Sequence, residues 1–416
     1  MRTTIVPLLA LAVTGFGAAF AIALEQRDPV PAGGSLGERR HAGPDSARVE
    51  AFLGSLRAAD PMICEMLADQ VRNFWNSNGD FGVGLLSDAS RSWEAARDSL
   101  YGPVTDPAAL RRLARGLDDP NPCVRRVAAK LLGDGESQAA VAVIREGLRS
   151  SSPRVREAAA LAAGHAEPLA LADELIRATR DQQPAVVAMA AWALGELERK
   201  DDVARLGELT RQSEARVRRA AAHGLGQIED PRGLAALHPL LQDRDEGVRV
   251  LAADAVGNIE SPASVEPLIA ALGDASALVR KAVAHGLGQI EQPRAAPALG
   301  RALNDRDPKM RVAAAEALGN LDELETAPPE LIAALGSSEP ELRKAAAEAL
   351  SNIPDPHAID ALGRALSDPD REIRAAVVEA LGKIEDERVT SHLLRALKDS
   401  DPEVRKRAAE ALGDRK

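Results

Sequence analysis

The stretch Asp243–Gly257, DRDEGVRVLAADAVG, decides the fold because the same pattern returns downstream at a fixed interval. It reappears as DASALVRKAVAHGLG at Asp274–Gly288 and as DRDPKMRVAAAEALG at Asp305–Gly319, so the interval is 31 residues. Each copy contains an aliphatic residue followed by a basic Arg, and each ends in Gly. Self-similarity at such a period is the signature of a repeat array.

The aliphatic residue before the Arg is the anchor of each repeat, and positions are counted from it. Successive anchors are 31 residues apart, except between Met310 and Leu342, where the spacing is 32. The anchors are Val124, Val155, Val186, Val217, Val248, Val279, Met310, Leu342, Ile373 and Val404. The sequence therefore predicts about ten consecutive repeats.

Each repeat is expected to contain two helices. In the repeat 230–259 the pattern predicts a first helix over about 232–241 and a second over about 246–256. Gly at the end of the second helix, as at Gly257, is expected to adopt the left-handed conformation that stops a helix. Residues able to cap the second helix precede it in seven repeats, at Asn121, Ser152, Asp245, Ser276, Asp307, Asp370 and Asp401.

Composition favours stacked helices over a sheet. Of the 416 residues 45% are hydrophobic but only 2% are aromatic, so the apolar material is small and aliphatic. Apolar residues at positions +4, +7 and +8, as at Ala252, Ala255 and Val256, define one helix face that a single repeat cannot bury alone. The expected fold class is an all-α solenoid.

The repeats resemble HEAT repeats, specifically the bilin-lyase-like subtype, over residues 107–416. The marks that carry the resemblance are an Asp five residues before the anchor and the Arg one residue after it. The resemblance implies a right-handed α-α superhelix in which these two side chains form a structural ladder between turns. The expected ladder residues are Asp119, Arg125, Asp243, Arg249, Asp274, Arg280, Asp305, Arg311, Asp368, Arg374, Asp399 and Arg405.

The N-terminal region divides into three parts. Residues 1–24 contain an apolar run from Ile5 to Leu24 and are expected to be a cleaved signal peptide, with an uncleaved anchor as the alternative. Residues 25–45 are expected to be a flexible tether, and 46–106 a helical cap with a degenerate repeat whose helices would span 46–59 and 61–75. The protein is therefore expected to be exported to the periplasm or cell envelope of a bacterium, or secreted.

The two cysteines, Cys64 and Cys123, occupy equivalent positions of neighbouring repeats. In an oxidising compartment such a pair favours a disulfide between the cap and the first full repeat. The alternative is two small buried residues.

Charge argues against a nucleic-acid partner. The net charge is −11, and Lys and Arg are scattered among Asp and Glu rather than gathered in a basic stripe.

Because the second helix lines the concave side in HEAT proteins, the resemblance implies that positions +2 and +6 point into a groove. Trp192 at +6 is the only aromatic residue between Pro107 and Lys416, and it either anchors a partner or fills a void where Val187 replaces the usual Arg. The candidate residues for binding a partner are Trp192, His223, Asp254, His285, Glu316, Lys130 and Arg219.

The pair His223 and His285, with Asp254 between them, raises the possibility of a metal site. Equivalent positions on stacked helices lie about 10 Å apart, so the two His would be about 20 Å apart, too far to share one ion. We expect no metal and no cofactor.

The expected function is a non-catalytic scaffold or adaptor of the cell envelope that binds an unidentified protein or peptide in its concave groove. It would touch a membrane only through an uncleaved N-terminal segment. One alternative is a sensory or inhibitory domain acting on a membrane partner. Another is a HEAT-like enzyme related to deoxyhypusine hydroxylase or bilin lyase, disfavoured because the sequence contains no His-Glu pair for iron and no distinctive catalytic constellation.

Overall fold

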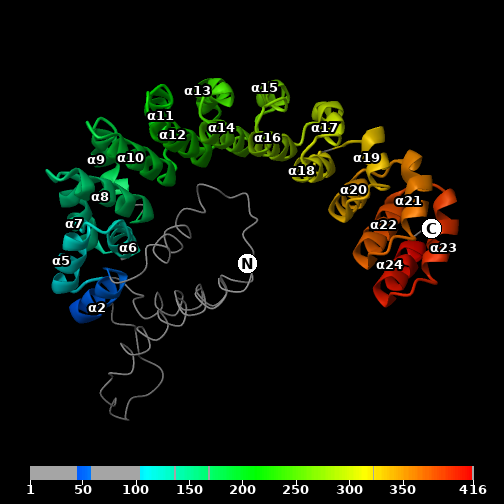
Figure 1. Ribbon diagram of the computed structural model, residues 1–416, viewed down its shortest axis with the longest axis horizontal. Helices are drawn as coiled ribbons and strands as arrows, with labels where there is room; N and C mark the ends of the chain where they lie inside the picture. The colour runs from blue at the N-terminus through cyan, green and yellow to red at the C-terminus, as the bar shows by residue number, and fades with distance from the viewer. Residues whose placement is uncertain (1–44, 58–103, 135–136, 167–168, 322, 415–416) are drawn as a thin grey trace, which may run out of the picture. The chain divides into compact units, whose positions relative to one another are not determined.

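The computed structural model describes residues 45–57, 104–134, 137–166, 169–321 and 323–414 (Figure 1). Within these ranges the chain consists of helices and connecting turns, without strands. The predicted signal peptide, nearly all of the tether and the second helix of the cap lie outside the described residues. No helix in these ranges is long and apolar enough to cross a membrane. The chain forms two compact units, 1–197 and 198–416, which are described separately.

In its described residues, unit 1 consists of one cap helix followed by a stack of three helix pairs. In each pair the two helices pack against each other, and α6, α8 and α10 pack on one another in turn. The helices are α2 (Ser46–Arg57), α5 (Pro107–Gly116), α6 (Pro122–Gly133), α7 (Gln138–Leu148), α8 (Pro153–Ala166), α9 (Ala172–Ala178) and α10 (Pro184–Glu196).

Unit 2 stacks seven helix pairs within its described part. The shorter first helices are α11 (Val203–Leu209), α13 (Leu234–Leu237), α15 (Val265–Ala271), α17 (Ala296–Ala302), α19 (Pro329–Ala334), α21 (Ile359–Ala365) and α23 (Arg388–Ala396). The longer second helices are α12 (Ala215–Ile228), α14 (Glu246–Asn258), α16 (Ala277–Ile290), α18 (Pro308–Gly319), α20 (Pro340–Asn352), α22 (Arg371–Lys383) and α24 (Pro402–Gly413). The long helices pack each on the next and form one row, while the short helices form a second row (Figure 1). Together, the helix pairs of the two units confirm the predicted all-α solenoid of about ten repeats.

Short 3₁₀ turns lead into many first helices. They are η1 (Leu169–Leu171), η2 (Lys200–Asp202), η3 (Pro231–Gly233), η5 (Pro262–Ser264), η6 (Pro293–Ala295) and η7 (Pro356–Ala358), with η4 (His238–Gln242) following α13. The predicted continuous first helix over 232–241 is therefore wrong in detail, since only 234–237 is α-helical. Pro239 explains the break because it has no N–H to donate to the carbonyl four residues earlier.

The predicted caps of the second helices are largely confirmed. Six of the seven residues accept a hydrogen bond from a backbone N–H of the first turn, namely Asn121, Asp245, Ser276, Asp307, Asp370 and Asp401. Ser152 is different, because its hydroxyl donates to a carboxylate oxygen of Asp118 at 2.8 Å.

The glycine that ends each repeat does not have the predicted role. The left-handed residues are instead glutamates near the ends of the repeats, at Glu198, Glu229, Glu260, Glu291 and Glu323, with φ between 50° and 57°. A Cβ on Gly257 would lie 2.7 Å from the Cα of Gly286, and one on Gly226 would lie 2.8 Å from the Cα of Ala255. These glycines allow neighbouring long helices to approach closely, and the prediction that Gly257 is a left-handed stop is wrong.

The Asp and Arg marks of the repeats meet across neighbouring turns. Arg280 donates from Nε and from a terminal nitrogen to the two carboxylate oxygens of Asp305, at 2.8 and 2.7 Å, and its other terminal nitrogen donates to the carbonyl of Asp274 at 2.8 Å. One guanidinium thus holds its own loop and the loop of the next repeat. The same pairing occurs at Arg156–Asp181, Arg218–Asp243, Arg249–Asp274, Arg343–Asp368 and Arg374–Asp399.

Three expected ladder arginines depart from this pattern. Arg125 and Arg405 donate to carbonyls of their own loops, while Arg311 pairs with Glu339 beside the 32-residue spacing. The Asp119 carboxylate is bound at 2.8 Å by Arg57, which lies on the cap helix α2. Because α2 also packs on α5 and α6, it closes the described end of unit 1.

Cys123 is in a disulfide bond. Cys64, the only other cysteine of the sequence, lies outside the described residues.

Candidate functional site

The row of long helices in unit 2 presents the predicted groove positions. We call the surface formed by positions +2 and +6 of α12, α14, α16, α18, α20, α22 and α24 the inner face, because this row lies on the inner side of the curve of unit 2 (Figure 1). The positions are set by the ladder Arg at +1 and by buried residues at +4, +7 and +8, which direct +6 away from the short helices. On α16, for example, Val283, Gly286 and Leu287 are buried and His285 is exposed.

His223, Asp254, His285 and Glu316 lie at successive +6 positions of four helices that pack in order, α12, α14, α16 and α18. Their exposure differs. His223 is buried, Asp254 is half-buried, and His285 and Glu316 are exposed. The described residues contain no group of three His, Cys, Asp or Glu side chains placed to hold a metal ion.

Asp254 stands out electrostatically. Its carboxylate makes no hydrogen bond or ion pair with any described residue, and burial alone raises its pKa to about 6. Burial disfavours the charged form of a carboxyl group, and no cation close by compensates. Ionisation of Asp254 is therefore less favourable than ionisation of an exposed Asp.

The pKa of Glu316 is also raised, first because neighbouring atoms remove part of the water around its carboxyl group although the side chain is exposed, and then by repulsion from Glu348 on α20. Lys281 and His285 on α16 oppose the shift through their charge, so both lie within electrostatic range of Glu316. Lys281 and Glu348 were not among the predicted binding residues, although they occupy the +2 and +6 positions that the pattern had already marked.

Arg219, a predicted groove residue, is already paired with a carboxylate of the protein itself. Its guanidinium donates to both carboxylate oxygens of Asp245, at 2.8 and 2.9 Å. Arg219 therefore tethers α12 to the cap of α14.

In unit 1, Lys130 lies 3.4 Å from Asp134 in an ion pair. Trp192 is only 6% exposed, and its ring packs over Gly164, where a Cβ would collide with it. The ring of His165 meets it edge-on at 5.4 Å between centroids, and burial, with repulsion from Lys130, lowers the pKa of His165 to about 4. The expectation that Trp192 offers an open aromatic anchor is wrong, because Gly164 leaves a void that the indole fills.

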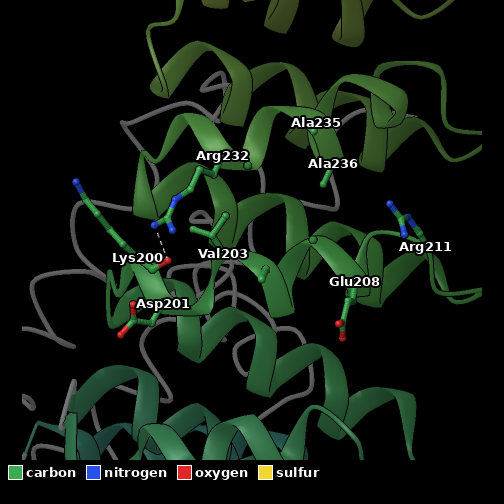
Figure 2. Close-up of a pocket in the computed structure, with 11 residues that line it drawn as sticks. Lys200, Asp201, Val203, Glu208, Arg211, Arg232, Ala235 and Ala236 are labelled. Atoms are coloured by element: carbon green, nitrogen blue, oxygen red, sulfur yellow. Dashed lines mark hydrogen bonds between the residues drawn. The ribbon is translucent and has the colours of Figure 1, made fainter.

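A hollow lies on the row of short helices. Figure 2 shows this pocket of about 310 Å³ beside α11, where Ala204, Gly207 and Ala236 leave space between neighbouring turns. Its Arg232 donates to the carbonyl of Lys200 at 2.9 Å and is bound by Asp230 at 2.8 Å. Small side chains on successive first helices are the sequence signal for such a hollow. Arg232 of this pocket is already paired with Asp230, whereas the carboxylate of Asp254 pairs with no described residue, so the inner face is the stronger candidate site.

The comparison with family models identifies the repeats. A family model described as HEAT repeats matches residues 108–172, 204–277, 265–335 and 328–413, more than half of the chain. No curated protein matches the chain. Among solved structures, an engineered protein from a structural genomics consortium is 23% identical with a TM-score of 0.48, covering 73% of this chain and 98% of that one. The complex of CpcE and CpcF of phycocyanin lyase from Nostoc sp. PCC7120 is 20% identical with a TM-score of 0.36, covering 59% of this chain and 95% of that one.

Proposed function

Because the chain belongs to the HEAT-repeat family, we propose that it is a non-catalytic scaffold that binds a protein or peptide segment on the inner face of unit 2. The carrying observation is the half-buried carboxylate of Asp254, which pairs with no described residue and lies in the middle of a row of polar side chains. In this repeat the structural residues are satisfied elsewhere, since Arg249 binds Asp274 and Asp245 caps α14. The +6 position is thus left to serve recognition.

The proposal includes a location in the cell envelope. Its support is the apolar run Ile5–Leu24, followed by Pro, Gly and charged residues. Fractionation of cells that produce the full chain tests it, with the mass of the mature protein reporting whether residues 1–24 are removed.

Photocrosslinking tests the binding role. A photoreactive amino acid replaces His285 on α16, and the matched control replaces Glu266 on α15, the short helix of the same repeat; both positions are exposed. We expect a partner from envelope extract to be captured by the inner probe and not by the outer one. Equal capture at both positions, or capture at the outer one alone, would refute the inner face as the binding surface.

A further inference from the structure

The acidic side chains of the inner face divide into two groups by their partners. Toward the C-terminal end Glu379 pairs with Arg407 at 2.9 Å, and Glu410 lies 3.8 Å from Lys406. In contrast, the side chains of Asp254, Glu316 and Glu348 make no direct hydrogen bond or ion pair with any described residue. The open carboxylates therefore lie on α14, α18 and α20.

Two basic side chains of the same face are bound to acids beside it. Arg219 is held by both oxygens of Asp245, and Lys344 lies 2.6 Å from Glu372. Lys281 acts on Glu316 only at a distance, through its charge. Two cations of the inner face are thus already in ion pairs, whereas three of its carboxylates form no ion pair with any described residue.

The described residues around Asp254 provide no substitute partner. At the inner positions of the two long helices packed against α14, the titratable side chains are Arg219 and His223 on α12, and Lys281 and His285 on α16. On the other side of α14, His238 of η4 is hydrogen-bonded to Ser264 at 2.9 Å. No charge from these groups counters the effect of burial on Asp254.

From this arrangement we infer that the inner face between α14 and α20 recognises a basic protein segment, whose Lys or Arg side chains pair with Asp254, Glu316 and Glu348. The inference rests on the proposed function and specifies its partner. A cation brought to a half-buried, unpaired carboxylate gains more than one brought to an exposed carboxylate, because the site is less screened by water. Asp254 is accordingly the strongest of the three contacts.

The spacing of the helices sets the spacing of the partner's charges. Packed helices lie about 8–10 Å apart, so Asp254 and Glu316, two helices apart, are separated by about 20 Å. An extended chain advances about 3.3 Å per residue, so two basic residues about six positions apart reach both carboxylates. One further repeat, about three more residues, reaches Glu348.

Selection from a random peptide library tests the inference. The full chain is immobilised, bound 15-residue peptides are sequenced, and each selected peptide is then crosslinked to the protein carrying the photoreactive residue at position 285. We expect enrichment of Lys and Arg, most often six positions apart. Asp254→Asn should weaken these peptides about tenfold, and Asp360→Asn, a matched change at an exposed position of the short helix α21, should leave them unchanged.

The outcomes separate the two proposals. Peptides that crosslink at position 285 without basic residues, or that bind the Asp254→Asn protein equally well, would overturn the basic-segment inference and leave the inner face as the binding surface. Selected peptides that fail to crosslink there would overturn both. Glu316→Gln is a second variant for the same comparison, expected to weaken only peptides that carry the second basic residue.

Discussion

Replacing Asp254 with Asn should make the protein more stable at neutral pH. Burial raises the pKa of Asp254 from 3.8 to about 6. Each pKa unit corresponds to about 1.4 kcal/mol, so the ionised carboxylate destabilises the folded state by roughly 3 kcal/mol at pH 7. Asn has nearly the same shape and no charge, so the variant avoids this penalty.

The sign follows from proton binding. Between pH 4 and pH 6 the folded protein holds the Asp254 proton more tightly than the unfolded chain does, so this residue makes stability fall as pH rises through that window. Below pH 4 both states are protonated, and wild type and Asp254→Asn should have similar stability. Above pH 6 the difference should reach its full value.

Urea unfolding at several pH values between 3.5 and 8, followed by circular dichroism, measures the effect. The control Asp360→Asn changes an exposed carboxylate on α21 and should show no such dependence. Parallel pH profiles for wild type and Asp254→Asn would refute the reasoning, because they would mean that the carboxylate ionises as readily in the folded protein as in the unfolded chain.

The remaining predictions concern packing, backbone, ladder, disulfide and binding. Gly257→Ala should destabilise by about 1–3 kcal/mol in thermal unfolding, because the new Cβ meets the Gly286 backbone, 2.7 Å from its Cα. Glu260→Gly should stabilise by about 0.5–1 kcal/mol in the same assay, since Glu260 has φ 51° and glycine adopts that conformation without strain. Arg280→Ala should lower the urea midpoint by an amount worth roughly 3 kcal/mol, because it leaves the carboxylate of Asp305 unpaired. Unfolded, unreduced protein should show no free thiol in a thiol assay, because Cys123 is disulfide-bonded. Basic peptides selected on the inner face should bind more weakly as pH falls through about 6 in fluorescence anisotropy, and Asp254→Asn should reduce that dependence.

Much of the fold could be predicted because the same capping, ladder and apolar residues recur in most of the periods of about 31 residues. The start of the α14 helix, its Asp245 cap and the positions of Arg249 and Asp274 all follow from features within one period. Gly257 shows the limit. Glycine serves both as a left-handed stop and as a point of close helix approach, and only the position of Gly286 in the neighbouring repeat decides between them.

The sequence could predict which repeat positions form the candidate site. It could not predict the burial or the partners of the side chains at those positions. The repeat pattern placed Trp192 at +6, but whether its ring faces solvent depends on the space above Gly164, which lies one repeat earlier. The pattern also marked Asp254, yet its burial and its missing partner depend on which neighbouring cations are already engaged, as Arg219 is by Asp245. Such competition between partners is a property of the packed structure.

The same repeat pattern explains both the Asp–Arg ladder and the unpaired side chains of the inner face. Most repeats use the Arg at +1 to bind a carboxylate of the next turn and use their small residues for helix contact, so the side chains at +6 are the least constrained by packing. In α22 and α24 these positions form ion pairs, whereas at Asp254 the half-buried carboxylate stays unpaired and destabilises the isolated protein. A partner that supplies the missing cation removes this free-energy cost when it binds. The stability lost at Asp254 in the isolated protein is then regained as binding affinity. Recognition is therefore expected to concentrate on α14 to α20, where the charges are open, rather than along the whole row of long helices.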